Sequence, residues 1–359
     1  MQIHNELNFN DMKYNFLGNT GLLVSEMCLG VMTFGGKGIW SLIGTQTQSE
    51  ADKLIDTAIK NGINFFDNSN NYSEGLSEQI MGTALKNLKV NPYEVVVATK
   101  VRLRIGLGVN QVGLSRAHIH ESIDTSLKRL QLNHIDLLYL HGVDLFTPLD
   151  ETMRGLEDIV RSGKVRYIGV CNHPAWMVMK ANGIAEKNCW TKFSVLQYFY
   201  SLAARDIEFS ILPMAKSENL AVLPWSPLAG GFLSGKYSRE TGKAGSGRRN
   251  LFDYPPINKE KTFDILDVIT QIAASHKVSV AQVALRWVMN QSGITSTIIG
   301  VSNEKQLLEN IDTTKLVLSD PEMDQLDKVS RIPTPYPNWI VEEFAKNRLP
   351  SQNEDGNQI

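Results

Sequence analysis

Four polar residues lie at the ends of short apolar runs in the first 141 positions of the chain. Asp67 and Tyr72 follow one run, Lys100 ends a second, and His141 ends a third. A carboxylate, a phenol, an ammonium and an imidazole are groups that hold or move protons. Brought together, the Asp67–Lys100 pair would hold a cation beside the phenol and lower its pKa from the ordinary value of about 10. Tyr72 could then donate a proton near neutrality.

A proton donor of this kind suits an oxygen that gains negative charge, as a carbonyl oxygen does when its carbon accepts hydride. His141 would orient or polarise that oxygen. Side chains do not donate hydride, so the set implies a nicotinamide cofactor. Further along the chain, Asn172 and Gln197 can hydrogen-bond a carboxamide, and Trp225 offers a flat face for stacking.

Small and basic residues after Trp225 could serve the phosphates of such a cofactor. The stretch 226–231 (Ser-Pro-Leu-Ala-Gly-Gly) predicts a turn at which backbone can approach a pyrophosphate. Lys236 and Arg248 could reach phosphates from the segment that follows. We interpret the neighbouring Arg249 as part of a solvated charge pair and leave it out of the site. Taken singly, most of these residues would be structural, and it is their joint occurrence that carries the hypothesis.

A scaffold that delivers several strand ends to one place is visible in the spacing of apolar runs. Eight β-branched runs alternate with helical patterns, and the first seven begin about 30 to 40 residues apart, which leaves room for one strand, one helix and two loops. The runs are Glu26–Val31, Ile63–Phe66, Val95–Lys100, Ile135–His141, Arg166–Cys171, Phe193–Gln197, Ala221–Trp225 and Thr297–Gly300. They predict a single-domain (β/α)8 TIM barrel, whose functional residues lie at the C-terminal mouth.

Helical patterns fill the intervals between the runs. Those expected most clearly are Glu50–Asn61, Glu78–Leu88, Arg116–Leu130 and Asp150–Ser162, with Ser115 capping the third and Gly163 ending the fourth. The competing interpretation is an open doubly wound sheet. Dinucleotide folds of that class usually carry GxGxxG after the first strand, and this sequence has none there.

Two irregular segments are expected to extend over the barrel mouth. Gly230–Pro256 is rich in Gly, Ser and Arg, and Ile332–Trp339 contains three prolines that prevent a regular helix. We therefore predict a barrel over residues 12–330. Residues 331–359 would form a C-terminal extension that could cover the substrate pocket.

Composition narrows the class of protein. The 359 residues carry 36 Lys and Arg against 38 Asp and Glu, a formal charge of -2, so we expect no nucleic-acid partner. No apolar run approaches the roughly 18 residues that span a bilayer, and we expect no membrane partner. Three cysteines form no CxxC pattern, which predicts a cytoplasmic protein. No metal site is expected, since His118 and His120 diverge when they lie two apart on a helix.

At this point the motifs match a known family. The chain resembles the aldo-keto reductases over residues 12–329, and is most similar to bacterial members and to the β-subunits of voltage-gated potassium channels. The matching pieces are Leu17-Gly18-Asn19-Thr20-Gly21-Leu22, Phe66-Asp67 with Tyr72, Thr99-Lys100, Leu140-His141 with Asp144, Trp225-Ser226-Pro227-Leu228, and Gly300-Val301-Ser302-Asn303 with Gln306, Glu309 and Asn310.

The resemblance implies a barrel that binds NADPH across its mouth and reduces an aldehyde or ketone. It makes Asp67, Tyr72, Lys100 and His141 the catalytic tetrad, with Tyr72 as general acid. The residues that it assigns to cofactor binding are Asp67, Asn172, Gln197, Trp225, Ser226, Leu228, Lys236, Arg248, Gly300, Ser302, Gln306, Glu309 and Asn310.

Some positions depart from the family pattern. Cys171 replaces the usual Ser or Thr, so the carboxamide contact rests more on Asn172. Many bacterial members carry Arg or Lys near Ser302, facing the adenosine 2′-phosphate, whereas here the only local cation is Lys305 and the loop supplies Lys236 and Arg248. NADPH is expected in preference to NADH. The alternative function is an NADP(H)-binding sensor subunit of the channel type with little turnover, and a third is a barrel enzyme without nicotinamide. His141, which some channel β-subunits lack, favours turnover. The physiological carbonyl and the oligomeric state are not predicted.

Overall fold

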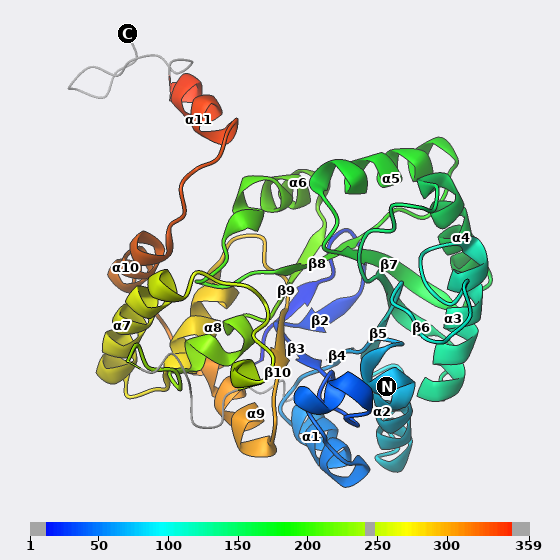
Figure 1. Ribbon diagram of the computed structural model, residues 1–359, viewed down its shortest axis with the longest axis horizontal. Coiled ribbons are helices and arrows are strands. Elements are labelled where there is room, and N and C mark those ends of the chain that lie inside the picture. The colour runs from blue at the N-terminus through cyan, green and yellow to red at the C-terminus, as the bar shows by residue number, and fades with distance from the viewer. Residues whose placement is uncertain (1–11, 241–247, 347–359) are drawn as a thin grey trace, which may run out of the picture.

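The computed structural model describes residues 12–240 and 248–346, in which eight parallel strands form a nearly closed barrel (Figure 1). The strands are β3 (Met27–Gly30), β4 (Phe65–Asp67), β5 (Val96–Val101), β6 (Ile135–Leu140), β7 (Val165–Cys171), β8 (Val195–Phe199), β9 (Ala221–Trp225) and β10 (Thr297–Gly300). They pair in chain order, and β10 lies beside β3. The last seam closes through a bond from Thr295 N to Val222 O at 2.9 Å. The predicted (β/α)8 class is confirmed.

The strands are apolar on both faces because each face is covered. On one side, alternate residues such as Phe65, Leu137 and Tyr139 fill the barrel interior. Their neighbours Phe66 and Leu138 point outward and pack under the surrounding helices. Since the interior is filled with side chains, polar chemistry is confined to the rim where the strands end.

Helices cover the outside of the barrel between successive strands. They are α1 (Gln48–Lys60), α2 (Leu76–Asn87), α3 (Arg116–Leu130), α4 (Leu149–Arg161), α5 (Ala175–Lys187), α6 (Ile211–Glu218) and α9 (Glu304–Ile311). Ser115 caps α3 as predicted, with its hydroxyl accepting from His118 N at 3.3 Å. Gly163 follows α4 with φ of 75°, a left-handed turn that glycine adopts without strain.

The long interval before β10 holds two helices, α7 (Lys259–His276) and α8 (Val280–Asn290), and α10 (Asp320–Ser330) follows α9. The first part of this interval is irregular, as predicted. Short 3-10 turns η4 (Ala229–Ser234) and η5 (Arg248–Asn250) are described there. Residues 241–247 lie outside the described part of the chain.

A hairpin that the sequence analysis did not predict lies at the N-terminal end of the barrel. Strands β1 (Tyr14–Phe16) and β2 (Leu23–Ser25) pair antiparallel, and β2 is visible within the ring of strands in Figure 1. Leu17 and Val24 are buried in the barrel interior. Gly18 carries the turn with φ of 61°, and a Cβ there would lie 2.6 Å from Ala221 N. Only glycine fits so close to the start of β9.

The described part of the C-terminal extension runs away from the barrel. Helix α11 (Asn338–Lys346) projects from the body of the molecule in Figure 1. Its start is tied to the rest of the chain by Asn338 Nδ2, which donates to Phe209 O at 2.8 Å. Residues 347–359 of the predicted pocket cover lie outside the described residues. Within the described ranges, no helix has both the length and the apolar character needed to cross a bilayer.

Candidate active site

The structure brings Asp67, Tyr72 and Lys100 into contact at the C-terminal mouth. Lys100, on β5, places Nζ 2.5 Å from Oδ2 of Asp67, which ends the neighbouring strand β4. The same Nζ donates to Asn68 O at 2.8 Å and lies 3.3 Å from the Tyr72 hydroxyl. All three side chains of this cluster are buried. A strand pair in register thus sets the ion pair, and the loop after β4 delivers the phenol to it.

The loop that carries Tyr72 is held in an unusual conformation. Within the 3-10 turn η2 (Tyr72–Gly75), Ser73 and Glu74 have φ of 50° and 56°, which non-glycine residues rarely adopt. The Ser73 hydroxyl compensates by donating to Phe34 O at 2.7 Å and accepting from Gly36 N at 2.9 Å. Strained loops that a surrounding structure holds in place are common at functional sites.

His141 follows β6 and faces the same cluster. Its ring meets the Tyr72 ring edge-on, with centroids 5.9 Å apart. The Ser69 hydroxyl, which donates to Asn71 Oδ1 at 2.6 Å, lies 3.1 Å from Nδ1 of His141 and fixes the orientation of the ring. Burial, together with the charges of Lys100 and Arg102, lowers the pKa of His141 well below its usual value. The imidazole is therefore neutral at physiological pH.

The electrostatics of Tyr72 correct one sequence prediction. Burial raises the pKa of Tyr72 to about 12, and the Lys100 cation opposes this only in part. The expected lowering of the phenol pKa is therefore wrong as a net effect, because a buried phenolate loses the stabilisation of water. For Lys100, burial alone would lower the pKa, but Asp67 and Tyr72 oppose it and the net shift is upward. The pair beside Tyr72 thus keeps its cation.

Of the two residues expected at a carboxamide, Gln197 on β8 reaches the ion pair directly, whereas Asn172, which follows β7, bonds Trp225. Gln197 Nε2 donates to Oδ1 of Asp67 at 2.9 Å, so this carboxylate is bonded on both oxygens. Asn172 Oδ1 accepts from Trp225 Nε1 at 3.1 Å. Cys171, the residue that departs from the family pattern, is buried in the barrel interior.

Trp225 already has aromatic neighbours. Its indole stacks on Phe199, with centroids 5.0 Å apart, and on Tyr254, at 6.0 Å with ring planes 9° apart. Tyr254 comes from the predicted loop Gly230–Pro256, which therefore returns to the mouth. The indole is half-buried and offers the kind of flat surface on which a planar ring stacks.

The backbone at two glycines on the rim is open to a ligand. A Cβ added at Gly231, on the turn after β9, or at Gly300, at the end of β10, would meet no atom within 4 Å. Ser226 shapes the first turn by accepting from Gly230 N at 2.8 Å. The turns after β9 and β10 therefore present accessible backbone, which fits the close approach of a pyrophosphate.

The other predicted cofactor residues flank these two turns. Ser302 N donates to Gln306 Oε1 at 2.9 Å at the start of α9, and Lys236 is exposed. Leu228 and Glu309 are half-buried and Asn310 is buried. Arg248 lies in η5, and its side chain is outside what the structure describes.

Arg249 corrects a further expectation, because it is buried and not part of a solvated pair. Its Nη1 donates to Ala229 O at 2.9 Å, and its Nη2 pairs with Asp253 at 2.6 Å. The guanidinium also lies 5.8 Å from the Phe232 ring centroid. Arg249 thus anchors the long loop to the turn after β9. Charge patterning could not reveal this, because the acceptor at Ala229 is backbone.

A buried charge pair behind the cluster also escaped sequence reasoning. Glu78 on α2 accepts from Thr99 Oγ1 at 2.7 Å and pairs with Arg129 Nη1 at 3.3 Å. The same Nη1 donates to Asn70 O at 3.0 Å, within the loop that leads to Tyr72. Arg129 on α3 therefore ties the Tyr72 loop to Glu78 on α2, which is bonded in turn to Thr99 on β5. No sequence signal distinguishes Glu78 and Arg129 from ordinary helix-surface charges.

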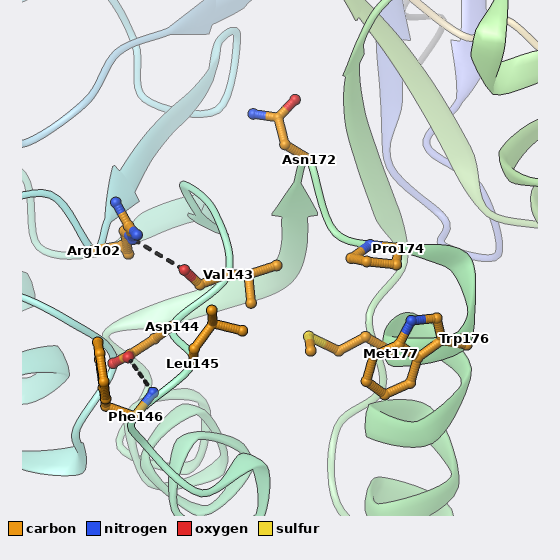
Figure 2. A pocket seen from close by; sticks show the side chains of 9 residues that line it. All are labelled: Arg102, Val143, Asp144, Leu145, Phe146, Asn172, Pro174, Trp176 and Met177. Atoms are coloured by element: carbon orange, nitrogen blue, oxygen red, sulfur yellow. Dashed lines mark hydrogen bonds between the residues drawn. The ribbon is translucent and has the colours of Figure 1, made fainter.

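A cavity of about 380 Å³ opens at the rim beside the cluster. Figure 2 shows its walls, with Arg102 and residues 143–146 on one side and Asn172, Pro174, Trp176 and Met177 on the other. None of the described residues of the C-terminal extension, 331–346, lines it. In the part of the chain that the structure describes, no three His, Cys, Asp or Glu side chains gather into a group that could hold a metal ion.

The fold is a barrel of the (β/α)8 class, and its buried polar cluster lies at the C-terminal mouth. Comparison with known proteins gives the family. Residues 26–331 match the model of the aldo/keto reductase family. The chain is 36% identical over 327 residues to the uncharacterized oxidoreductase YrpG of Bacillus subtilis, covering 89% of this chain and 96% of that protein.

Fungal and plant proteins are similar over comparable lengths. A versiconal hemiacetal acetate reductase of Aspergillus parasiticus is 33% identical, with 88% of this chain and 96% of the relative covered. A probable voltage-gated potassium channel subunit beta of Oryza sativa is 34% identical, with 89% and 96% covered. The chain therefore belongs to the aldo/keto reductase family. This family comprises oxidoreductases that use nicotinamide cofactors and act on small carbonyl compounds.

Proposed function

We propose that this protein reduces an aldehyde or ketone to an alcohol with NADPH, and that Tyr72 is the general acid. The observation that carries the proposal is the 3.3 Å contact between the Tyr72 hydroxyl and Lys100 Nζ, with Nζ bonded in turn to Asp67. A buried proton donor beside a fixed cation is the arrangement that protonation of a developing alkoxide requires.

The tetrad residues have distinct roles in this mechanism. The chemistry that a nicotinamide would supply at this mouth, when bound, is hydride for the carbonyl carbon. Tyr72 gives its proton to the carbonyl oxygen as negative charge develops there, and Lys100 stabilises the phenolate that remains. Asp67 keeps Lys100 charged and in place. His141, neutral because of burial and nearby cations, orients the carbonyl oxygen by hydrogen bonding and not by charge.

The residues on the later strands suit the cofactor. Asn172 and Gln197 present amides for a carboxamide. Each amide also bonds a neighbouring side chain, Trp225 for Asn172 and Asp67 for Gln197, and would keep that bond while it binds the carboxamide. Trp225 provides the stacking surface, and the open backbone at Gly231 and Gly300 accommodates the phosphates. We assign the preference for NADPH over NADH to cations near the adenosine end, namely Lys236, Arg248 and Lys305.

The remaining cofactor contacts are assigned mainly to the turn after β10 and to helix α9. Ser302 and Gln306 would face the phosphates and ribose, and Glu309 and Asn310 would lie at the adenine, as the family resemblance implies. Ser226 and Leu228, on the turn after β9, would also face the phosphates and ribose. We take residues 12–330 as the catalytic barrel and residues 331–359 as an extension. The cytoplasmic location stays a prediction from composition.

The proposal is tested in stopped-flow absorbance with 4-nitrobenzaldehyde and with NADPH or NADH, each varied up to saturation. We expect repeated turnover with release of oxidised cofactor, and a lower KM for NADPH than for NADH. A single slow oxidation of bound NADPH would instead support the sensor function. If neither cofactor quenches the tryptophan fluorescence and neither is consumed, the nicotinamide assignment is wrong.

A further inference from the structure

The cavity at the rim is lined by residues that flank the proposed reaction centre. Val143 in its wall is two residues from His141, and Asn172 in the facing wall accepts from Trp225, the proposed nicotinamide platform. Arg102, the residue after β5, also lines the cavity (Figure 2). Its charge is close enough to lower the pKa of His141. A substrate whose carbonyl meets the tetrad would therefore extend its other end into this space.

Arg102 is a cation that the fold does not neutralise. Its Nε donates to Val143 O at 3.2 Å, as drawn in Figure 2, which leaves the two terminal nitrogens of the guanidinium for other partners. Among the described residues, no carboxylate lies within ion-pair distance of it. Its backbone has φ of 144°, a strained value for a non-glycine residue. The structure thus keeps a half-buried, unpaired guanidinium at the cavity.

The acidic side chain in the same wall is occupied elsewhere. Asp144 Oδ2 accepts from Leu114 N at 2.7 Å and from Thr147 Oγ1 at 2.6 Å, while Oδ1 accepts from Phe146 N at 2.9 Å. These bonds lower the pKa of Asp144 and turn its carboxylate toward the loop backbone. Asp144 therefore shapes the wall and does not pair with Arg102.

The rest of the cavity is lined by apolar side chains that are largely exposed to water. Leu145 is 82% exposed, Phe146 95% and Trp176 62%, and Met177 lies beside Trp176 in Figure 2. Contiguous exposed apolar side chains at a cleft usually mark a binding site. The volume of about 380 Å³ suits a small organic molecule and not a polypeptide segment.

We propose that this cavity selects aromatic carbonyl compounds that carry a carboxylate remote from the carbonyl, with Arg102 binding the carboxylate and Phe146 and Trp176 contacting the ring. The inference rests on the proposed reductase function and specifies its substrate class. A planar guanidinium matches a carboxylate in two parallel hydrogen bonds. Arg102 is then a specificity-determining residue, and the tetrad remains the site of proton transfer.

The test compares 4-formylbenzoate with its uncharged methyl ester at saturating NADPH. We expect wild-type protein to favour the acid in kcat/KM by roughly tenfold, mainly through KM, which is the scale of one charge-assisted contact at a half-exposed site. Arg102→Gln should bring the acid-to-ester ratio close to one, and Arg102→Glu should favour the ester. Arg104→Gln is the matched control, because among the described residues Arg104 bonds Gly106 O and Gly108 O alone, and it does not line the cavity. It should keep the wild-type ratio.

Each outcome separates the two proposals. If the wild type reduces acid and ester equally well, or if Arg102→Gln lowers both by the same factor, the assignment of Arg102 is overturned while the reductase function stands. Loss of the preference in Arg104→Gln as well would reduce the effect to general surface charge, and would also overturn it. If the wild type reduces neither compound, the proposed function fails and the substrate class fails with it.

Discussion

The two halves of the barrel mouth are built differently. On β4 to β6, the tetrad is a closed cluster in which buried groups already contact one another, and Lys100 Nζ alone reaches Asp67, Asn68 and Tyr72. On β7 to β10, the proposed cofactor residues are half-buried or exposed for the most part, spread over several turns, and border open space at Gly231 and Gly300. One half is preorganised and the other is accessible.

The difference matches the two tasks proposed for the mouth, which are proton transfer and the binding of an extended cofactor. Proton transfer needs groups fixed within tenths of an ångström, which buried contacts provide. An extended ligand that enters and leaves needs surface that stays available, so its contacts are distributed and individually weaker. The Gln197–Asp67 bond of 2.9 Å links the two halves. Changes on the tetrad side should therefore be large and those on the cofactor side modest.

The largest effect is expected for Tyr72→Phe, which removes the proton donor but keeps the ring. Turnover should fall by roughly a thousandfold, as expected when general acid catalysis is lost. NADPH binding, followed by tryptophan fluorescence, should be nearly unchanged, because the hydroxyl belongs to the other half of the mouth. Reduction of 4-nitrobenzaldehyde at the wild-type rate would show that Tyr72 is not the acid.

Lys100→Met should destabilise the fold as well as stop catalysis. It leaves the Asp67 carboxylate buried without its cation, which costs about 3 kcal/mol of the free energy of unfolding. Urea denaturation measures the loss. The control is Lys37→Met, since the Lys37–Glu74 pair is solvent-exposed on both sides and should be worth about 0.5 kcal/mol or less. Equal effects of the two variants would contradict the preorganised cluster.

The pH dependence of stability should report the buried imidazole of His141. Its folded-state pKa lies well below the ordinary value of 6.5, so the unfolded chain binds a proton there and the folded chain does not. The stability it contributes is present above pH 6.5 and decreases as the pH falls. In His141→Gln, the decline should be less steep by up to about 1.4 kcal/mol per pH unit. Identical slopes in urea titrations would refute this.

On the cofactor side, Trp225→Ala should weaken NADPH binding only about fivefold to tenfold, which is the scale of one aromatic contact. Calorimetric titration gives the Kd without relying on the indole as reporter. Trp190→Ala is a suitable control, because Trp190 packs on Arg154 outside the mouth. A hundredfold loss would mean that this half of the mouth is as preorganised as the other half.

Local sequence patterns were sufficient to predict a helix or strand wherever its formation depends on its own residues. The predicted ranges Arg116–Leu130, Ala221–Trp225 and Thr297–Gly300 coincide with α3, β9 and β10. Other strands shift by one or two residues, as β4 does when it extends to Asp67. The hairpin β1–β2 was missed because its strands are three residues each, too short for an apolar period to show.

Some features of the candidate site could likewise be predicted from the sequence, and others could not. That Asp67, Tyr72, Lys100 and His141 converge followed from their positions at the ends of parallel strands. The roles of Arg249 and Arg129 did not follow, since each bonds a backbone carbonyl of a segment remote in the chain. Nor could sequence place Tyr254 against Trp225.

By itself, the sequence determined the barrel, the family and the chemical groups available at its mouth, because strand period, strand order and residue type are written locally. Only the tertiary structure decided how those groups behave. Burial outweighs the Lys100 charge and raises the pKa of Tyr72. Among the described residues Arg102 has no carboxylate within ion-pair distance, and Asp144 in the same cavity wall bonds the backbone amides of Leu114 and Phe146. Desolvation and pairing depend on which distant segments meet, and no local pattern records that.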